Sequence, residues 1–166
     1  MSRFDPYVII DTLNRHDVEY VIVGDIAASL WGIDSARMVF EVCYRLQDDN
    51  VDKLAAALQE LNAQERGVAN ASPITFDRNT FQNSDHFTLW TLGGALDCVA
   101  TPAGVKSYDD LFPSSWTFDL DGRPIRVCSL EDLIRTREAA GRTQDKFALE
   151  QLYALKKLIE SGAGNS

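Results

Sequence analysis

Residues 23–44 read VGDIAASLWGIDSARMVFEVCY, and the interpretation of the whole chain depends on this stretch. A run of β-branched residues ends at Gly24, a short helix is predicted next, and a second predicted strand carries Glu41. Glycine lets the backbone approach a ligand closely, and the first N–H groups of a helix attract anions. The layout therefore favours a phosphate-binding junction, although a simple tight turn also explains a single glycine.

Asp25 follows this glycine directly and argues against phosphate binding. A carboxylate beside the junction would repel a phosphate group. Its place at the start of the predicted helix over residues 25–32 suits an N-cap, which is the simpler structural role.

The second strand is predicted over residues 37–44, and it places Val39, Glu41 and Cys43 on one face. Metal-dependent transfer of a nucleotide needs two carboxylates on such a face to hold Mg²⁺. Only Glu41 is an acid, so a salt-bridged or surface role is the alternative. Asp97 lies in the strongly apolar stretch GALDCV, where a buried carboxylate needs either hydrogen-bonding partners or a function.

The composition describes one ordinary globular domain. The chain has 166 residues, of which 45% are hydrophobic and 25% charged, and we expect a single domain over residues 1–160 with a disordered tail over 161–166. Neither a signal peptide nor a transmembrane segment is visible, so a cytoplasmic protein that does not engage a membrane is expected. The three cysteines lack metal-ligand spacing and are expected to be buried, reduced thiols.

The net charge of −9 opposes binding to nucleic acid in general, but it leaves room for a local basic patch. Positive charge gathers near the C-terminus, where it could meet phosphates or could form solvated helix surface. The residues concerned are Arg135, Arg137, Arg142, Lys146, Lys156 and Lys157.

The predicted elements mix helices with strands, and the fold class is α+β: a mixed β-sheet with helices packed on it and a C-terminal helical pair. Hairpins are expected around Gly93-Gly94 and at Asp121-Gly122. Residues 66–80 are expected to be irregular. The helices are predicted over residues 5–16, 25–32, 49–63, 129–141 and 143–161, and the last of them takes its apolar residues from Phe147, Leu149, Leu152, Leu155 and Ile159.

Four segments in this order resemble the AbiEii-type nucleotidyltransferase toxins, which include the Men-type toxins of toxin–antitoxin systems. They are VEYVIVGDIAASLWG, FEVCY, GALDCVATPAGVKSYDDL and IRVCSLEDLIRTREAAGRTQDKFALEQL, and the last is the most specific. The resemblance implies the minimal nucleotidyltransferase fold. It also implies transfer of a nucleotide from an NTP to tRNA with Mg²⁺, and an antitoxin protein as partner.

The resemblance also assigns site residues, with several departures from the family pattern. Gly24 matches the first glycine of the phosphate loop, while Asp25 stands where glycine or serine belongs. Val39 replaces the first acid of the metal-binding D-x-D, and Glu41 replaces the second with one extra methylene. Asp97 matches the third acid, so Glu41 and Asp97 are the candidate metal ligands.

The C-terminal part of the pattern supplies the remaining candidates. Arg137 stands for a lysine and would contact the triphosphate, and Asp145 matches a late acid that would orient either Arg137 or the acceptor. Glu41, Asp97, Arg137 and Asp145 are thus the catalytic candidates. Arg37, which replaces a threonine, and Lys146 join Gly24 and Asp25 as candidates for nucleotide binding.

These departures leave two hypotheses open. In the first, the chain is a Mg²⁺-dependent nucleotidyltransferase that modifies RNA. In the second, it is a non-catalytic relative that binds a partner protein or RNA, because Asp25 adds negative charge at the phosphate position and Val39 removes a metal ligand.

Overall fold

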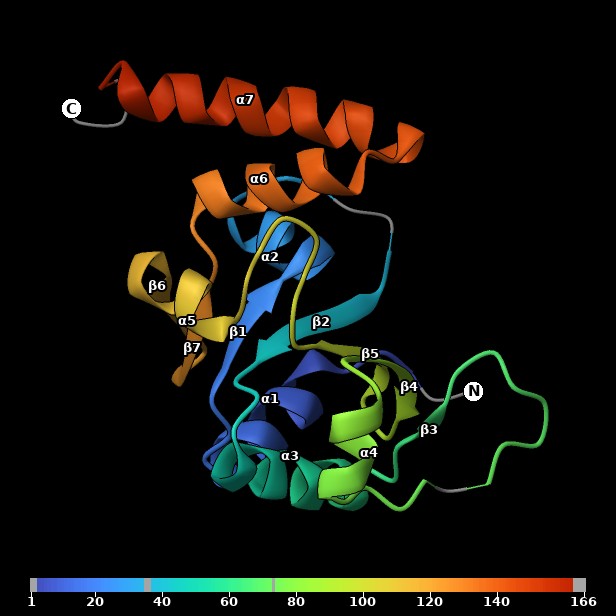
Figure 1. The fold of residues 1–166 in the computed structure, drawn as a ribbon. Helices are drawn as coiled ribbons and strands as arrows, with labels where there is room; N and C mark the ends of the chain where they lie inside the picture. Colours follow the sequence, from blue (N-terminus) through green and yellow to red (C-terminus); the bar gives the residue numbers. More distant parts are fainter. Residues whose placement is uncertain (1–2, 35–36, 73, 163–166) are drawn as a thin grey trace.

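The computed structural model describes residues 3–34, 37–72 and 74–162 (Figure 1). Its centre is a mixed seven-stranded sheet in the order β3-β4-β5-β2-β1-β7-β6, which confirms the predicted α+β class. The strands are β1 (Tyr20–Val23), β2 (Val39–Tyr44), β3 (Gln64–Glu65), β4 (His86–Thr91), β5 (Gly94–Val99), β6 (Trp116–Leu120) and β7 (Arg123–Val127).

The central strands are apolar because both faces of the sheet are covered. Every residue of β1 and β5 is buried. β2 runs antiparallel to β1 and parallel to β5, so that Glu41 is level with Val23 on one side and with Asp97 on the other. The sheet thereby brings the two acids of the sequence analysis onto neighbouring strands.

Helices lie on both sides of this sheet (Figure 1). α1 and α3 lie together on one side with α4 beside them, whereas α2, α6 and α7 are stacked on the other. α6 and α7 form the predicted C-terminal pair, and α7 is the outermost element. The helices are α1 (Pro6–Arg15), α2 (Gly24–Leu30), α3 (Asp48–Glu60), α4 (Arg78–Asn83), α5 (Tyr108–Leu111), α6 (Leu130–Ala140) and α7 (Lys146–Glu160), with 3-10 turns η1 (Phe112–Ser114) and η2 (Thr143–Asp145).

Two helix caps and the hairpin turns lie where the sequence predicts them. Asp5 caps α1 by accepting a hydrogen bond from the Tyr7 amide, and Ser129 caps α6 in the same way. Asp121 and Gly122 have φ of 53° and 83°, as a two-residue hairpin turn between β6 and β7 requires. The other hairpin joins β4 to β5, and its turn residues are 92 and 93.

The core runs through the sheet and its helices as one cluster that extends from Ile9 to Leu152. The three cysteines belong to it and are free and buried, as expected. Burial raises the pKa of the Cys43 and Cys128 thiols to about 12, so these groups act as small hydrophobic side chains. No helix in the described part of the chain is both long and apolar enough to cross a membrane.

Two expectations need correction, one for Asp25 and one for residues 66–80. Asp25 is not an N-cap, because α2 already begins at Gly24 and Val23 is its cap residue. The stretch expected to be irregular, residues 66–80, follows β3, and its last three residues form the start of α4, which Asp77 caps. Residues 161 and 162 close the end of α7, while 163–166 lie outside the described residues.

The apolar residues of the last helix are divided between the core and the surface. Leu152 is fully buried and Leu149 and Leu155 pack partly against the core. Phe147 and Ile159, however, are 70% and 53% exposed. Phe147 lies on a different side of α7 from Leu152, and Ile159 lies in its last turn.

Candidate functional site

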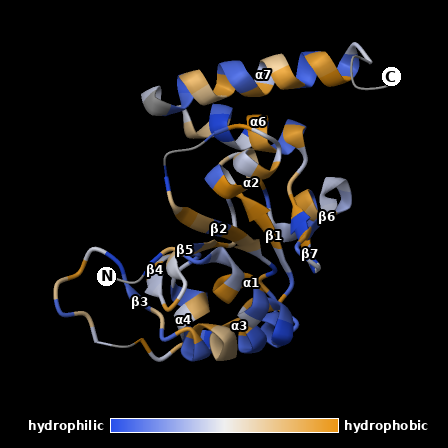
Figure 2. Ribbon diagram, turned by 180° about the vertical axis from the view of Figure 1, so that it is seen from behind, coloured by the Kyte–Doolittle hydropathy of each residue, from blue (hydrophilic) through white to orange (hydrophobic). Residues whose placement is uncertain are grey.

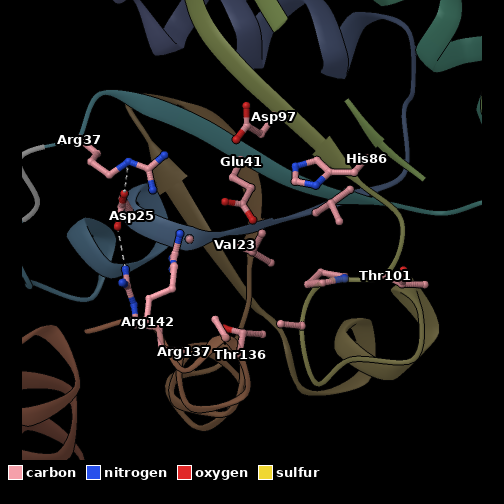
Figure 3. A pocket seen from close by; sticks show the side chains of 15 residues that line it. Val23, Asp25, Arg37, Glu41, His86, Asp97, Thr101, Thr136, Arg137 and Arg142 are labelled. Atoms are coloured by element: carbon pink, nitrogen blue, oxygen red, sulfur yellow. Dashed lines mark hydrogen bonds and ion pairs between the residues drawn. The ribbon is translucent and has the colours of Figure 1, made fainter. Parts of the chain in front are cut away.

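A cleft of about 310 Å³ opens where β2 and β5 meet the start of α2 and the inner side of α6 (Figure 3). Arginine side chains and Asp25 gather on one side of it, His86 and Thr101 lie on the other, and Glu41 lies between them. Its lining residues include Gly24, Asp25, Arg37, Glu41, His86, Asp97, Thr101, Thr136, Arg137 and Arg142.

Glu41 packs directly against the glycine at the β1–α2 junction. Gly24 has φ of +70°, and a Cβ added to it would lie 2.8 Å from Glu41 Oε2. The carboxyl group of Glu41 therefore uses the space that glycine leaves. Burial, followed by repulsion from Asp97, raises the pKa of the Glu41 carboxyl above its usual range.

Asp97 already has a cationic partner. Arg66, at the end of β3, places Nη2 2.6 Å from Asp97 Oδ1 and donates from Nη1 to the Leu89 carbonyl oxygen at 3.0 Å. Its guanidinium also lies over the Trp90 ring, 5.8 Å from the centroid. Three contacts on neighbouring strands hold the guanidinium in place, so the Asp97 carboxylate is paired inside the protein.

Arg137 is the centre of a second ionic cluster. Its Nη2 lies 2.8 Å from Asp25 Oδ1, and its Nη1 lies 3.0 Å from Asp145 Oδ1. Arg142 adds a 2.8 Å contact from Nε to Asp145 Oδ2, and Arg37 Nε lies 3.6 Å from Asp25 Oδ2. The Arg137 side chain is only 7% exposed and that of Asp25 13%, so these pairs interact with little screening by water.

The cleft is not a good Mg²⁺ site. Among the residues the structure describes, no group of three or more His, Cys, Asp or Glu side chains is placed to hold a metal ion. Asp97 is paired with Arg66, Val39 supplies no oxygen, and Glu41 has a raised pKa. Of the three positions assigned to the metal, only Glu41 offers a carboxyl group outside an ion pair with arginine, and that group resists ionisation, whereas Mg²⁺ prefers charged oxygen ligands.

The structure gathers most of the predicted site residues. Gly24, Asp25, Arg37, Glu41, Asp97 and Arg137 all line the cleft. Asp145 is buried behind Arg137 and contacts it, which is the geometry expected of an orienting residue. Lys146 is exposed and does not line the cleft, because η2 turns the chain so that Asp145 faces Arg137 instead.

The sequence interpretation missed Arg66 and His86. Arg66 lies in the stretch that was expected to be irregular, 31 positions before its partner Asp97. His86 has no Cys or Ser partner at a recognisable spacing, and it lines the cleft only because β4 pairs with β5. Neither residue carries a local signal that could have identified it.

No family model matches this sequence, and no curated protein matches it significantly. Solved structures do match. ANT(2'')-Ia in complex with adenylyl-2''-tobramycin is 16% identical with a TM-score of 0.56, over 96% of this chain and 89% of that one. The solution structure of the same antibiotic-resistance factor is 14% identical with a TM-score of 0.56, over 96% and 91%.

A Thermotoga maritima protein assigned to the nucleotidyltransferases is 15% identical with a TM-score of 0.55, over 92% of this chain and 96% of that one. Identities this low establish the fold and leave activity open. The chain therefore has the nucleotidyltransferase fold, as predicted, while membership of the AbiEii-type toxins remains a prediction.

Proposed function

We propose that this chain is a non-catalytic protein of the nucleotidyltransferase fold, which acts by binding a partner protein. The observation that carries the proposal is the buried ion pair between Arg137 and Asp25. Arg137 stands at the position expected to contact the triphosphate, and Asp25 at a position expected to leave room for it. The carboxylate of Asp25 thus takes the place of the phosphate as the anion that Arg137 binds.

The charge balance of the whole cleft supports the same conclusion. Arg37, Arg66, Arg137 and Arg142 each contact a carboxylate of the chain, that of Asp25, Asp97 or Asp145. Nucleotidyl transfer relies on positioning and on neutralising the charge of a triphosphate. A cleft whose arginines already pair with carboxylates of the chain, and which lacks a good Mg²⁺ site, offers little attraction or stabilisation for that charge.

The kind of partner follows from the resemblance and from the net charge. AbiEii-type toxins engage an antitoxin protein and tRNA. The net charge of −9 repels the phosphates of RNA, so a protein in the antitoxin role is the favoured partner. The alternative is catalysis: Glu41 and Asp97 would hold Mg²⁺, Arg137 would contact the NTP, and Asp145 would orient Arg137 during transfer to tRNA.

A transfer assay separates the two functions. Each α-labelled NTP is incubated with Mg²⁺, total tRNA and the wild-type chain, or with the double variant Val39→Asp/Asp25→Gly. Val39→Asn/Asp25→Gly is the matched control, because it has nearly the same shape without the restored charge. Circular dichroism checks that each variant is folded.

We expect no transfer from the wild type or from the asparagine control. Transfer by the aspartate variant alone would show that the scaffold lacks only its metal ligand and a free phosphate site. Transfer by the wild type would overturn the proposal and identify the nucleotide. A second arm co-expresses the chain with the product of any small reading frame adjacent to its gene, and failure of the two to co-purify would contradict the antitoxin-like partner.

A further inference from the structure

The outer side of α7 carries an apolar stripe that no described part of the chain covers. Phe147 is 70% exposed and Leu158 56%, and Ala154 between them is also exposed. Figures 1 and 2 show α7 as the outermost helix, and the colouring of Figure 2 shows hydrophobic positions recurring along it. Exposed apolar side chains that line up along one helix are a feature of interaction surfaces.

The spacing of this stripe is that of a helix–helix seam. Phe147, Gln151, Ala154 and Leu158 follow one another at intervals of four, three and four residues, so they lie in one row along the helix. We call these four residues the outer seam. Leu152, which anchors α7 to the core, lies on a different side of the helix, so the seam can be covered without disturbing that anchor.

We propose that the outer seam binds the outer seam of a second copy of this chain, with the two α7 helices antiparallel. In that arrangement Phe147 packs against Leu158 of the second copy, and Gln151 packs against Ala154 of the second copy. The small side chain of Ala154 near the middle lets the helices approach closely. A two-fold axis repeats every contact, as an isologous dimer requires.

Two charged residues beside the seam favour a second copy of the chain as its partner, and they favour the antiparallel orientation. Glu150 and Lys157 are exposed and flank the seam on the same side, seven residues or two helical turns apart. Antiparallel pairing places Glu150 of one copy near Lys157 of the other, twice per dimer. Parallel pairing would instead place Glu150 near Leu155, which offers it no charge. The helix is therefore complementary to itself in one orientation only.

The experiment measures the mass of the full chain by sedimentation velocity, over concentrations from about 1 to about 500 µM, because a contact of one helix per copy is small and its affinity modest. Three variants are compared with the wild type: Glu150→Lys, Lys157→Glu, and the two changes combined. Tyr153→Ser is the matched control, since Tyr153 is exposed on α7 but lies outside the seam. Circular dichroism confirms that α7 stays folded in each.

We expect the wild type to dimerise and each single change to raise the dimer dissociation constant about tenfold, since it replaces two attractive pairs with two repulsive ones. The combined change should restore the dissociation constant to within about threefold of the wild type. The Tyr153→Ser variant should dimerise like the wild type. A wild-type monomer throughout the range would overturn the proposal. So would single changes without effect, or a combined change that restores nothing.

Discussion

Glu41 is a partly buried acid that lies between the β1–α2 junction and β5. It was identified as an acid of the metal site, and it does lie level with Asp97 on the next strand. Its carboxyl group, however, packs against Gly24, and its pKa is raised by burial and then by the charge of Asp97. Ionisation of this carboxyl group therefore lowers the free energy of unfolding.

This cost predicts how the free energy of unfolding depends on pH. An acid whose pKa is higher in the folded state binds its proton more tightly there, so stability falls as pH rises from the unfolded pKa to the folded one. The penalty is absent below about pH 4.3, the ordinary glutamate value, and complete above the folded pKa. Glu41→Gln should therefore stabilise the protein at pH 8 and lose this advantage towards pH 4.

Urea unfolding at a series of pH values checks this prediction. Glu138→Gln, which changes an exposed glutamate on α6, is the control for removing one negative charge from an acidic protein. The explanation by the raised pKa of Glu41 would be contradicted if Glu41→Gln increased the free energy of unfolding no more than the control does. It would also be contradicted if the increase did not vary with pH.

At the scale of elements, the junction between β1 and α2 depends on one backbone conformation. Gly24 has φ of +70°, a conformation that destabilises any residue with a Cβ by about 1 to 2 kcal/mol. The Cβ of a residue substituted here would also lie too close to the Glu41 carboxyl group. Gly67 has φ of +89° with no atom within 4 Å of an added Cβ, so it isolates the backbone cost.

Gly24→Ala should therefore destabilise the protein by more than Gly67→Ala, which should lose only about 1 to 2 kcal/mol. The excess should shrink when both substitutions are repeated in a Glu41→Ala background, because the carboxyl group 2.8 Å away is removed and only the Cβ contact at 3.3 Å is left. Thermal and urea unfolding measure both differences. An equal loss of stability for the two substitutions in the wild-type background would show that the Glu41 side chain moves aside without destabilising the protein.

At the scale of the whole molecule, stability is unevenly distributed. β1 and β5 are buried throughout at the centre of the sheet, whereas Leu152 is the one fully buried side chain among the described residues of α7. Local opening costs least where few apolar contacts are lost. Amide hydrogen exchange at low protein concentration should therefore be slowest in β1, β2 and β5 and fastest, among the longer helices, in α7. Protection of α7 equal to that of β1 would contradict this order.

Features that depend on residues close together in the chain could be predicted without the structure. Apolar runs marked the strands, Asp5 and Ser129 marked the starts of two helices, and Asp121-Gly122 marked a hairpin turn, because caps and turns involve residues only a few positions apart. The resemblance then placed Gly24 and Arg137 in one site, and the structure brings them to the same cleft.

The chemistry available to that site depends on contacts between residues far apart in the chain, which form only on folding. The pair of Asp25 with Arg137 joins residues 112 positions apart, and the pair of Asp97 with Arg66 depends on where β3 ends beside β4. No local pattern encodes such pairs, since the order of strands and the packing of α6 on α2 set the distances between the charges. Whether a carboxylate in this cleft meets a ligand or an arginine of its own chain is therefore a property of the folded arrangement.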